Sequence, residues 1–376
     1  MTLRLTGFQK LALLTILSVY TMIVIGVIVR STGSGLGCGD WPLCRGVIIP
    51  NLEGANAWDS ADWIESFHRW WGVLVGFLVV GLAVMAWRVH RATRSIVGAA
   101  VAAVALTGFQ AWLGKWTVES GNSGESVTAH LAVSMIILAA TIFVFVRSRY
   151  AADVPQHGGS QRTTLLVAFA TASVYALMLF GSNVTTSAAS LVFPDWPLMN
   201  GQLIPTWSED PTAAGLQLTH FAHRAVAFIV GLIMLWTTVV VLRDARRAQT
   251  DAGDRLLGLI GTAATLYVIQ VIVGAFQIWS TLAAWAVSLH LALGAAIWGL
   301  MAASVLYSWY DARALRPATA GAGTAARTDD ATAATLSASS GEIAMARSSR
   351  KDKVRAYIAL TKPRIIELLL VTTVPA

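Results

Sequence analysis

Charged residues are scarce in this chain of 376 residues. Asp, Glu, Lys and Arg together make up 12% of it, against about 25% in a typical soluble domain. Hydrophobic residues make up 56% and include 15 tryptophans, which excludes general disorder, because disordered chains are poor in apolar residues. Two cysteines are too few to staple a disulfide scaffold of this length. The composition predicts a polytopic membrane protein.

Long uncharged runs supply the expected membrane spans. Eight runs can cross about 30 Å of hydrocarbon as helices. Helices are expected because backbone in lipid must satisfy its own hydrogen bonds, and no run alternates like a barrel strand. The first run is too long for a signal peptide, and no small-residue cleavage site follows it. The uncharged cores are Leu11–Val29, Trp70–Trp87, Ser95–Gly114, Ser126–Val146, Thr163–Val184, Ala225–Leu242, Leu256–Trp279 and Trp285–Trp309.

The loops between these runs alternate in charge. Arginine and lysine gather before the first run, after the last, and in every second loop, whereas the other loops are acidic or neutral. By the positive-inside rule, we expect both termini in the cytoplasm and the acidic loops outside the plasma membrane. Because these loops account for the net charge of +7, we expect membrane lipid around the protein and no nucleic-acid partner.

The sequence contains an internal repeat. Residues 39–46 (GDWPLCRG) match residues 194–201 (PDWPLMNG) at an offset of 155, which also carries His68-Arg69 onto His223-Arg224. Later the offset becomes 160. Each half has four spans, so both insert the same way up, as a parallel repeat. The expected fold is all-α, with eight transmembrane helices as two pseudo-symmetric four-helix bundles, residues 1–155 and 156–312.

Four histidines lie near the outer ends of parallel spans. His68 and His130 are at similar depth in the first half, and the repeat gives His223 and His290 in the second. Ionisable side chains inside a bundle are costly and usually functional. Two imidazoles facing each other across a bundle core can ligate haem iron. A single histidine could equally anchor at the interface, but two depth-matched couples favour haem; zinc lacks further converging ligands.

Charged neighbours accompany these histidines. Arg69 and Arg224 directly follow the first histidine of each half, where a guanidinium can pair with a haem propionate or snorkel to the headgroups. Glu65 lies one turn before His68 on the same helix face, and the repeat places His220 there in the second half. This difference suggests chemistry in the first half and a permanent cofactor in the second. A solvated Glu65 and a structural His220 are the alternatives.

The two cysteines, Cys38 and Cys44, share the first outer loop. The outer face is oxidising, so we expect a disulfide there, either as a loop staple or with a redox or gating role. The second half has Phe193 and Met199 at these positions. The bridge is therefore special to the half that contains Glu65.

Residues 10–310 resemble the haem A synthase family, which converts haem O to haem A for terminal oxidases. The resemblance rests on the loop from Gly33 to Cys44, the motif Glu65-Ser66-Phe67-His68-Arg69, the four histidines and the eight-span repeat. The cysteine pair is similar to that of members with an outer-loop disulfide.

The resemblance implies a division of labour between the halves. The first half is expected to hold the substrate haem O near His68 and His130, with Glu65 taking part in catalysis. A resident haem b is expected on His223 and His290. The implied reaction oxidises a ring methyl of haem O to a formyl group through successive hydroxylations, and the substrate's farnesyl tail explains a site within the membrane.

Two other functions compete with this interpretation. One is a bis-histidine dihaem protein of the cytochrome b type that transfers electrons from quinol, and the other is a haem transporter or chaperone without chemistry. The difference between Glu65 and His220 favours the enzyme, because an electron carrier needs no differently equipped sites. The electron-transfer partner and the oligomeric state, a homo-oligomer included, stay open.

The composition changes near the C-terminal end. Residues 313–350 are expected to form a flexible linker rich in Ala, Thr, Ser and Gly. Residues 351–376 include YIALTKPR, which resembles the start of protohaem IX farnesyltransferase, the haem O synthase. The stretch ends before that family's Asp-rich motifs, so we expect no prenyl transfer. A truncated fusion with this partner enzyme and an apolar tail resting on the membrane are both compatible with it.

Overall fold

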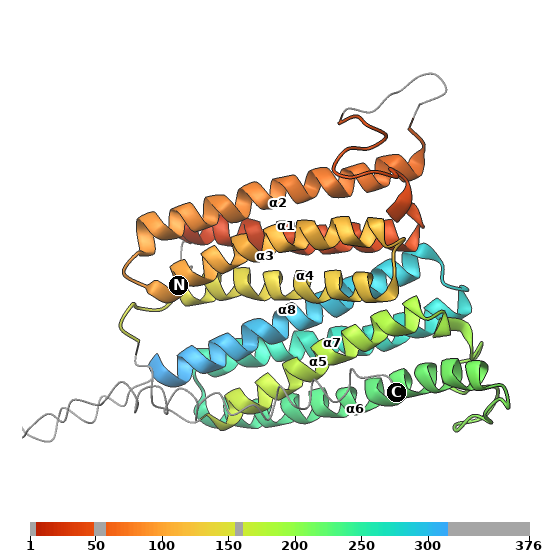
Figure 1. Ribbon diagram of the computed structural model, residues 1–376. Coiled ribbons are helices and arrows are strands. Elements are labelled where there is room, and N and C mark those ends of the chain that lie inside the picture. Colours follow the sequence, from red (N-terminus) through yellow and green to blue (C-terminus); the bar gives the residue numbers. More distant parts are fainter. Residues whose placement is uncertain (1–4, 49–57, 155–160, 315–376) are drawn as a thin grey trace, which may run out of the picture. The chain divides into compact units, whose positions relative to one another are not determined.

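A computed structural model of the chain describes residues 5–48, 58–154 and 161–314 (Figure 1). All eight long helices among these residues are long and apolar enough to cross a membrane, and the described part contains no β-strand. This confirms the expected all-α fold class. The helices are α1 (Gly7–Ser31), α2 (Ser60–His90), α3 (Arg94–Glu119), α4 (Gly124–Arg147), α5 (Arg162–Thr186), α6 (Pro211–Ala248), α7 (Asp251–Trp279) and α8 (Ala284–Ala314), with short 3-10 helices η1 (Ser34–Leu36) and η2 (Ala189–Leu191).

Several sequence predictions lie outside the described residues. They are the boundary between the halves at residue 155, the linker beyond residue 314, and the segment 351–376 that resembles a farnesyltransferase.

Helices α2 and α6 begin well before their apolar cores. Asp59 caps α2 and Asp210 caps α6, each accepting hydrogen bonds from backbone N–H groups of the first turn. Pro211 occupies the first position of α6, where its missing N–H has no helical partner to lose. His68 and His223 therefore lie more than two turns inside their helices, and not at the helix ends that the apolar cores alone suggest.

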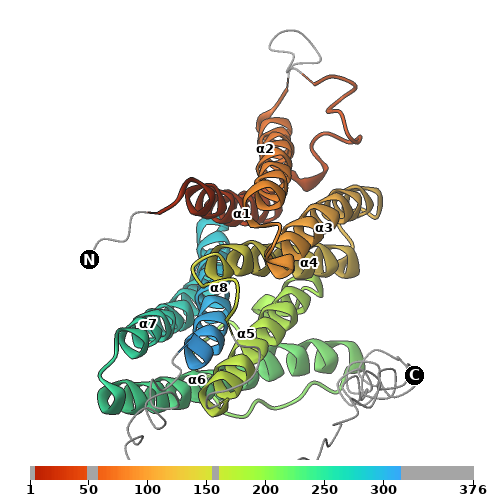
Figure 2. The same cartoon turned by 90° about the vertical axis from the view of Figure 1, so that its left-hand side faces the viewer.

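The eight helices pack as two four-helix bundles. In the first, α2 and α4 each pack against α1 and α3; in the second, α6 and α8 each pack against α5 and α7. Helix α8 also contacts α1 and α4, and α4 contacts α5. Figure 2 shows α4 beside α8, with α2 and α6 on opposite sides of them. The interface between the bundles is thus formed by α1, α4, α5 and α8.

Two tyrosines cross this interface in equivalent ways. The hydroxyl of Tyr20 on α1 donates to the carbonyl of Ala292 on α8 at 3.0 Å, and that of Tyr175 on α5 donates to the carbonyl of Ala132 on α4 at 3.1 Å. The donors are related by the offset of 155 and the acceptors by that of 160. Hydrogen bonds between helices help to fix membrane bundles, where association gains little from the hydrophobic effect. The sequence repeat is therefore also a repeat of contacts between the halves.

Candidate functional site

The four predicted histidines line one cavity. His68 lies on α2, His130 on α4, His223 on α6 and His290 on α8, and the cavity that they line has a volume of about 1780 Å³. Ordinary small-molecule sites have about 300–1,000 Å³, so this cavity has room for more than one such ligand. Within each half the two histidines lie on helices that sit diagonally across the bundle, and both line this cavity. The structure therefore brings each predicted couple together.

Every one of these imidazoles packs against a glycine on another helix of its bundle. A Cβ atom built on Gly26 of α1 would lie 3.0 Å from Cε1 of His68, and the corresponding distances are 3.3 Å for Gly114 to His130, 3.1 Å for Gly181 to His223 and 3.2 Å for Gly274 to His290. These contacts are tighter than nine in ten of those that real Cβ atoms make, so a side chain here would push the ring away by a few tenths of an ångström. Glycine at these four positions thus allows the imidazole ring to lie directly on the neighbouring backbone.

The histidine side chains are suited to hold an iron porphyrin. Their four Nδ1 atoms, like that of His220, are buried and have no hydrogen-bond partner among the described residues. Buried polar atoms without a partner usually mark a site that something else completes. Paired imidazoles in the core of a four-helix bundle are a donor set that would hold haem iron.

Glu65 lies beside the first couple and is buried, with 3% of its surface exposed. It also lines the cavity. Its Oε2 accepts a hydrogen bond from the backbone N–H of Cys38 at 2.9 Å, and its Oε1 pairs with Arg69 at 2.5 Å. A buried carboxylate requires such partners. The group is therefore a fixed part of the cavity wall and not a solvated carboxylate at the interface.

Arg69 and Arg224, which directly follow His68 and His223, each bind the outer loop of their own half. Arg69 donates to the carbonyls of Pro42 and Leu43. Arg224 donates to the carbonyl of Leu198 at 2.9 Å and to that of Asp195 at 3.0 Å. The guanidinium groups thus hold the two repeated loops against α2 and α6. Both arginines also line the cavity, and their pairing with propionates stays a prediction.

His220 takes the place of Glu65 in the second half. Its Nε2 accepts a hydrogen bond from Nε of Arg224 at 3.1 Å, and its ring contacts Phe193 with centroids 5.4 Å apart. The residue is 5% exposed. The equivalent arginines of the two halves therefore have different partners. Arg69 pairs with the carboxylate of Glu65, and Arg224 donates to the imidazole of His220.

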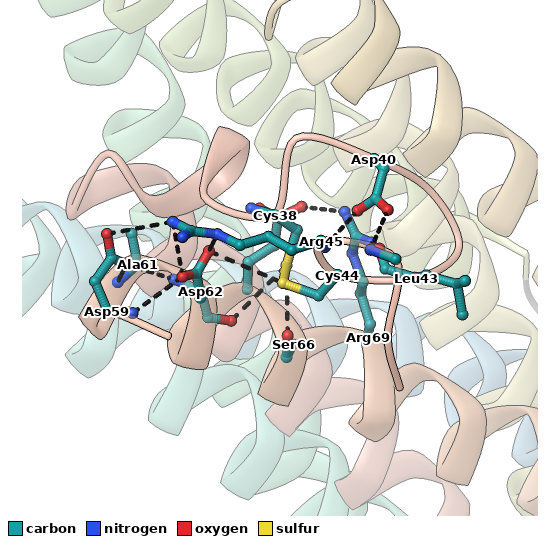
Figure 3. Close-up of a disulfide and its surroundings, with 12 residues drawn as sticks. Cys38, Asp40, Leu43, Cys44, Arg45, Asp59, Ala61, Asp62, Ser66 and Arg69 are labelled. Carbon is teal, nitrogen blue, oxygen red and sulfur yellow. Dashed lines mark hydrogen bonds and ion pairs between the residues drawn. A yellow bond between two sulfur atoms is a disulfide. The ribbon is translucent and has the colours of Figure 1, made fainter. Parts of the chain in front are cut away.

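Cys38 and Cys44 form the expected disulfide. Figure 3 shows Asp62 and Ser66 of α2 directed at it, and the Ser66 hydroxyl lies 3.4 Å from Sγ of Cys38. Asp62 is fully buried and pairs with Arg45 of the same loop, with Nη2 to Oδ2 at 2.9 Å. The disulfide closes the loop on itself, and this ion pair fastens the loop to the helix that carries Glu65.

Each outer loop is also closed by an aspartate. In the first, Asp40 accepts hydrogen bonds from the backbone N–H groups of Arg45 and Gly46. In the second, Asp195 accepts from those of Asn200 and Gly201, both at 2.7 Å. The Gly201 N–H is the main reason that the pKa of Asp195 is lower than usual. The repeated motif therefore specifies one loop conformation, which needs no disulfide in the second half.

The sequence reasoning missed two glycines and two glutamines of the site. Gly26 and Gly181 are related by the offset of 155, so the repeat carried a signal for them. Gln110 and Gln270 are related by the offset of 160; both line the cavity, and their Oε1 atoms are buried without a partner among the described residues. A polar side chain repeated within two apolar spans was the signal that could have identified them.

Comparison with known proteins agrees with this geometry. Residues 9–302 match the family model COX15-CtaA, described as cytochrome oxidase assembly protein. A protein of Alkalihalophilus pseudofirmus named heme A synthase is 33% identical over 235 residues, which are 60% of this chain and 75% of that protein. Proteins with the same name from Shouchella clausii (31% identity; 69% of this chain, 85% of the relative) and Listeria monocytogenes (28%; 75% and 87%) are also similar.

The matched region includes all eight spans up to residue 302 in α8, the disulfide loop and both histidine couples. It ends before residues 351–376, so the predicted resemblance of that segment to a farnesyltransferase has no support from this match. This chain is a multi-pass membrane protein that belongs to the COX15-CtaA family of cytochrome oxidase assembly proteins.

Proposed function

We propose that this protein is a haem A synthase, a membrane oxidoreductase that oxidises a ring methyl of haem O to a formyl group by successive hydroxylations and so makes haem A for terminal oxidases. One observation carries the proposal: a single cavity holds two histidine couples, and in the described part of the chain only the first has a buried carboxylate beside it. The family relationship supports the same activity.

The two halves have different tasks in this proposal. The substrate haem O is held in the first half by His68 and His130, and a resident haem b is held in the second half by His223 and His290. The bound haem supplies the redox chemistry that attack on an inert methyl group requires. The orphaned Nδ1 atoms and the glycines opposite the imidazoles support these assignments.

Glu65 is the proposed catalytic residue. Oxidation of a methyl group releases protons, and a carboxylate in the cavity wall can accept and return one. The Cys38 N–H and Arg69 each hold one of its oxygens, which fixes the orientation of the group. In this scheme the Cys38–Cys44 disulfide acts as a staple that keeps the Cys38 N–H in place.

The proposed location is the plasma membrane, with both termini in the cytoplasm. The arginines at the ends of α2, α4, α6 and α8 support this orientation. It places the histidine couples and the disulfide loop near the outer face, where the oxidising environment favours the bridge.

The activity is tested by expressing the chain together with a haem O synthase in cells that make no haem A. We expect reverse-phase chromatography of the extracted haems to show haem A and its hydroxylated precursor. The competing dihaem electron carrier would instead contain two haem b groups per chain and leave haem O unchanged. Unchanged haem O in cells that hold the full-length, membrane-inserted protein would contradict the proposed activity.

A further inference from the structure

The two halves differ where their second and third helices pack together, which is α2 with α3 in the first half and α6 with α7 in the second. Each of these helix contacts is called a seam below. In the second half, Tyr267 of α7 is 7% exposed and its ring packs on Gly231 of α6, with its Cε1 3.3 Å from a Cβ built on that glycine. Its hydroxyl donates to the carbonyl of Ala227 at 2.6 Å. Tyr267 therefore bridges α6 and α7 along the wall of the cavity, which all three residues line.

The equivalent seam in the first half has no such bridge. The repeat places Thr107 of α3 at the position of Tyr267, and Gly76 of α2 at that of Gly231. The Thr107 hydroxyl bonds within its own helix, to the carbonyl of Ala103 at 2.8 Å. No atom lies within 4 Å of a Cβ built on Gly76, apart from its own helix and chain neighbours. Thr107 and Gly76 both line the cavity.

Neighbouring positions along the seam show the same difference in size. Gly72 and Val73 of α2 correspond to Ala227 and Phe228 of α6, and Gly108 and Ala111 of α3 correspond to Val268 and Val271 of α7. Gly108 and Ala111 lie within about one turn of Thr107 on α3, and Val268 and Val271 stand in the same relation to Tyr267 on α7. Of the seven wall positions compared, five are smaller in the first half, Gly76 and Gly231 are the same residue, and Phe77 is larger than its counterpart Leu232. The wall of the first half is thus thinner at the depth just below His68.

The seam faces lipid and leads to polar side chains of the cavity. Val73 and Phe77 beside it are 59% and 72% exposed on a membrane-spanning helix and also line the cavity, as does Phe228 of the second half at 68%. Behind it, the cavity is lined by the polar side chains of His68, His130 and Gln110. An opening at this position would connect the hydrocarbon with the first histidine couple and with no aqueous compartment.

We propose that the α2–α3 seam is the lateral entrance through which the substrate, an iron porphyrin with a long apolar chain, passes from the lipid to His68 and His130, and that Tyr267 closes the α6–α7 seam and retains the haem of the second half. This inference rests on the proposed function. It explains why one fold used twice can exchange its ligand in one half and keep it in the other.

The test exchanges the two side chains. Thr107→Tyr adds the ring where Gly76 leaves space, and Tyr267→Thr removes the bridge from the second half. In purified protein, we expect Thr107→Tyr to slow the uptake of added haem O at least about tenfold while the resident haem b is fully retained. We expect Tyr267→Thr to release haem b to excess apomyoglobin at least about tenfold faster than the parent, because a buried hydrogen bond and the ring packing are lost.

Each variant carries its own control. Full haem b content shows that Thr107→Tyr is folded, and haem O uptake at the parent rate shows the same for Tyr267→Thr. Tyr267→Phe keeps the ring and should release haem b more slowly than Tyr267→Thr. Parent rates of uptake and release in both exchanged variants would overturn the entrance while leaving the proposed function intact. A failure of the proposed function differs, because the parent protein itself would then leave haem O unconverted.

Discussion

Replacing Glu65 with Gln is expected to lower the conversion of haem O by about a hundredfold or more, the usual contribution of a general acid or base. The amide has nearly the same shape and can still accept the hydrogen bond of the Cys38 N–H. It has no negative charge, so it cannot pair with Arg69 or take up a proton. The measurement is the ratio of haem A and its hydroxylated precursor to haem O in extracts of cells that supply haem O.

Two readouts separate catalysis from a structural effect of this substitution. The variant should retain its haem b and still bind added haem O, since the histidine couples are unchanged. Glu119→Gln makes the same chemical change at an exposed position outside the cavity, where Glu119 pairs with Lys115, and should convert haem O like the parent. Parent activity of Glu65→Gln would remove Glu65 from the mechanism, and loss of haem O binding would reduce it to a part of the scaffold.

Replacing His223 with Ala is expected to remove nearly all resident haem b. Loss of an axial ligand affects affinity more than loss of a supporting group, which already costs about 10–100-fold at metal sites. His68→Ala should keep the haem b of the second half and lose the conversion of haem O. The measurement is the Soret absorbance per chain of the purified protein.

His90→Ala is the matched control for these two variants. His90 lies at the end of α2, where its ring contacts Phe8 with centroids 4.5 Å apart, and it does not line the cavity. Its replacement should leave the haem b content unchanged. If His68→Ala lost the haem b and His223→Ala kept it, the assignment of the two halves would be reversed.

The fold was largely predictable because the membrane imposes simple rules. Scarce charge and uncharged runs such as Leu11–Val29 predict helices without any knowledge of packing. The repeat then predicted two bundles, and the contacts of Tyr20 and Tyr175 follow the same offsets. The starts of α2 and α6 were less clear, because Asp59 and Asp210 extend these helices into polar sequence that a hydropathy pattern does not include.

The site was predictable in its histidines but not in its surroundings. Histidine is rare in a span, so His68 and its three counterparts stand out. Glycine is common in membrane helices, so Gly26 does not stand out in the sequence. Its lack of a side chain nevertheless allows His68 to lie on α1. The role of Tyr267 depends on its hydrogen bond from α7 to α6. The sequence shows that Thr107 replaces this tyrosine in the first half, but only the structure shows that the tyrosine reaches the neighbouring helix.

The most direct test of the account is the identity and number of haems in the isolated protein. The account predicts about one haem b per chain in the parent, bound through His223 and His290, and a second porphyrin that binds through His68 and His130 when haem O is supplied. Protein that stays colourless despite ample haem, or that holds two haem b groups with equal tenacity, would contradict it.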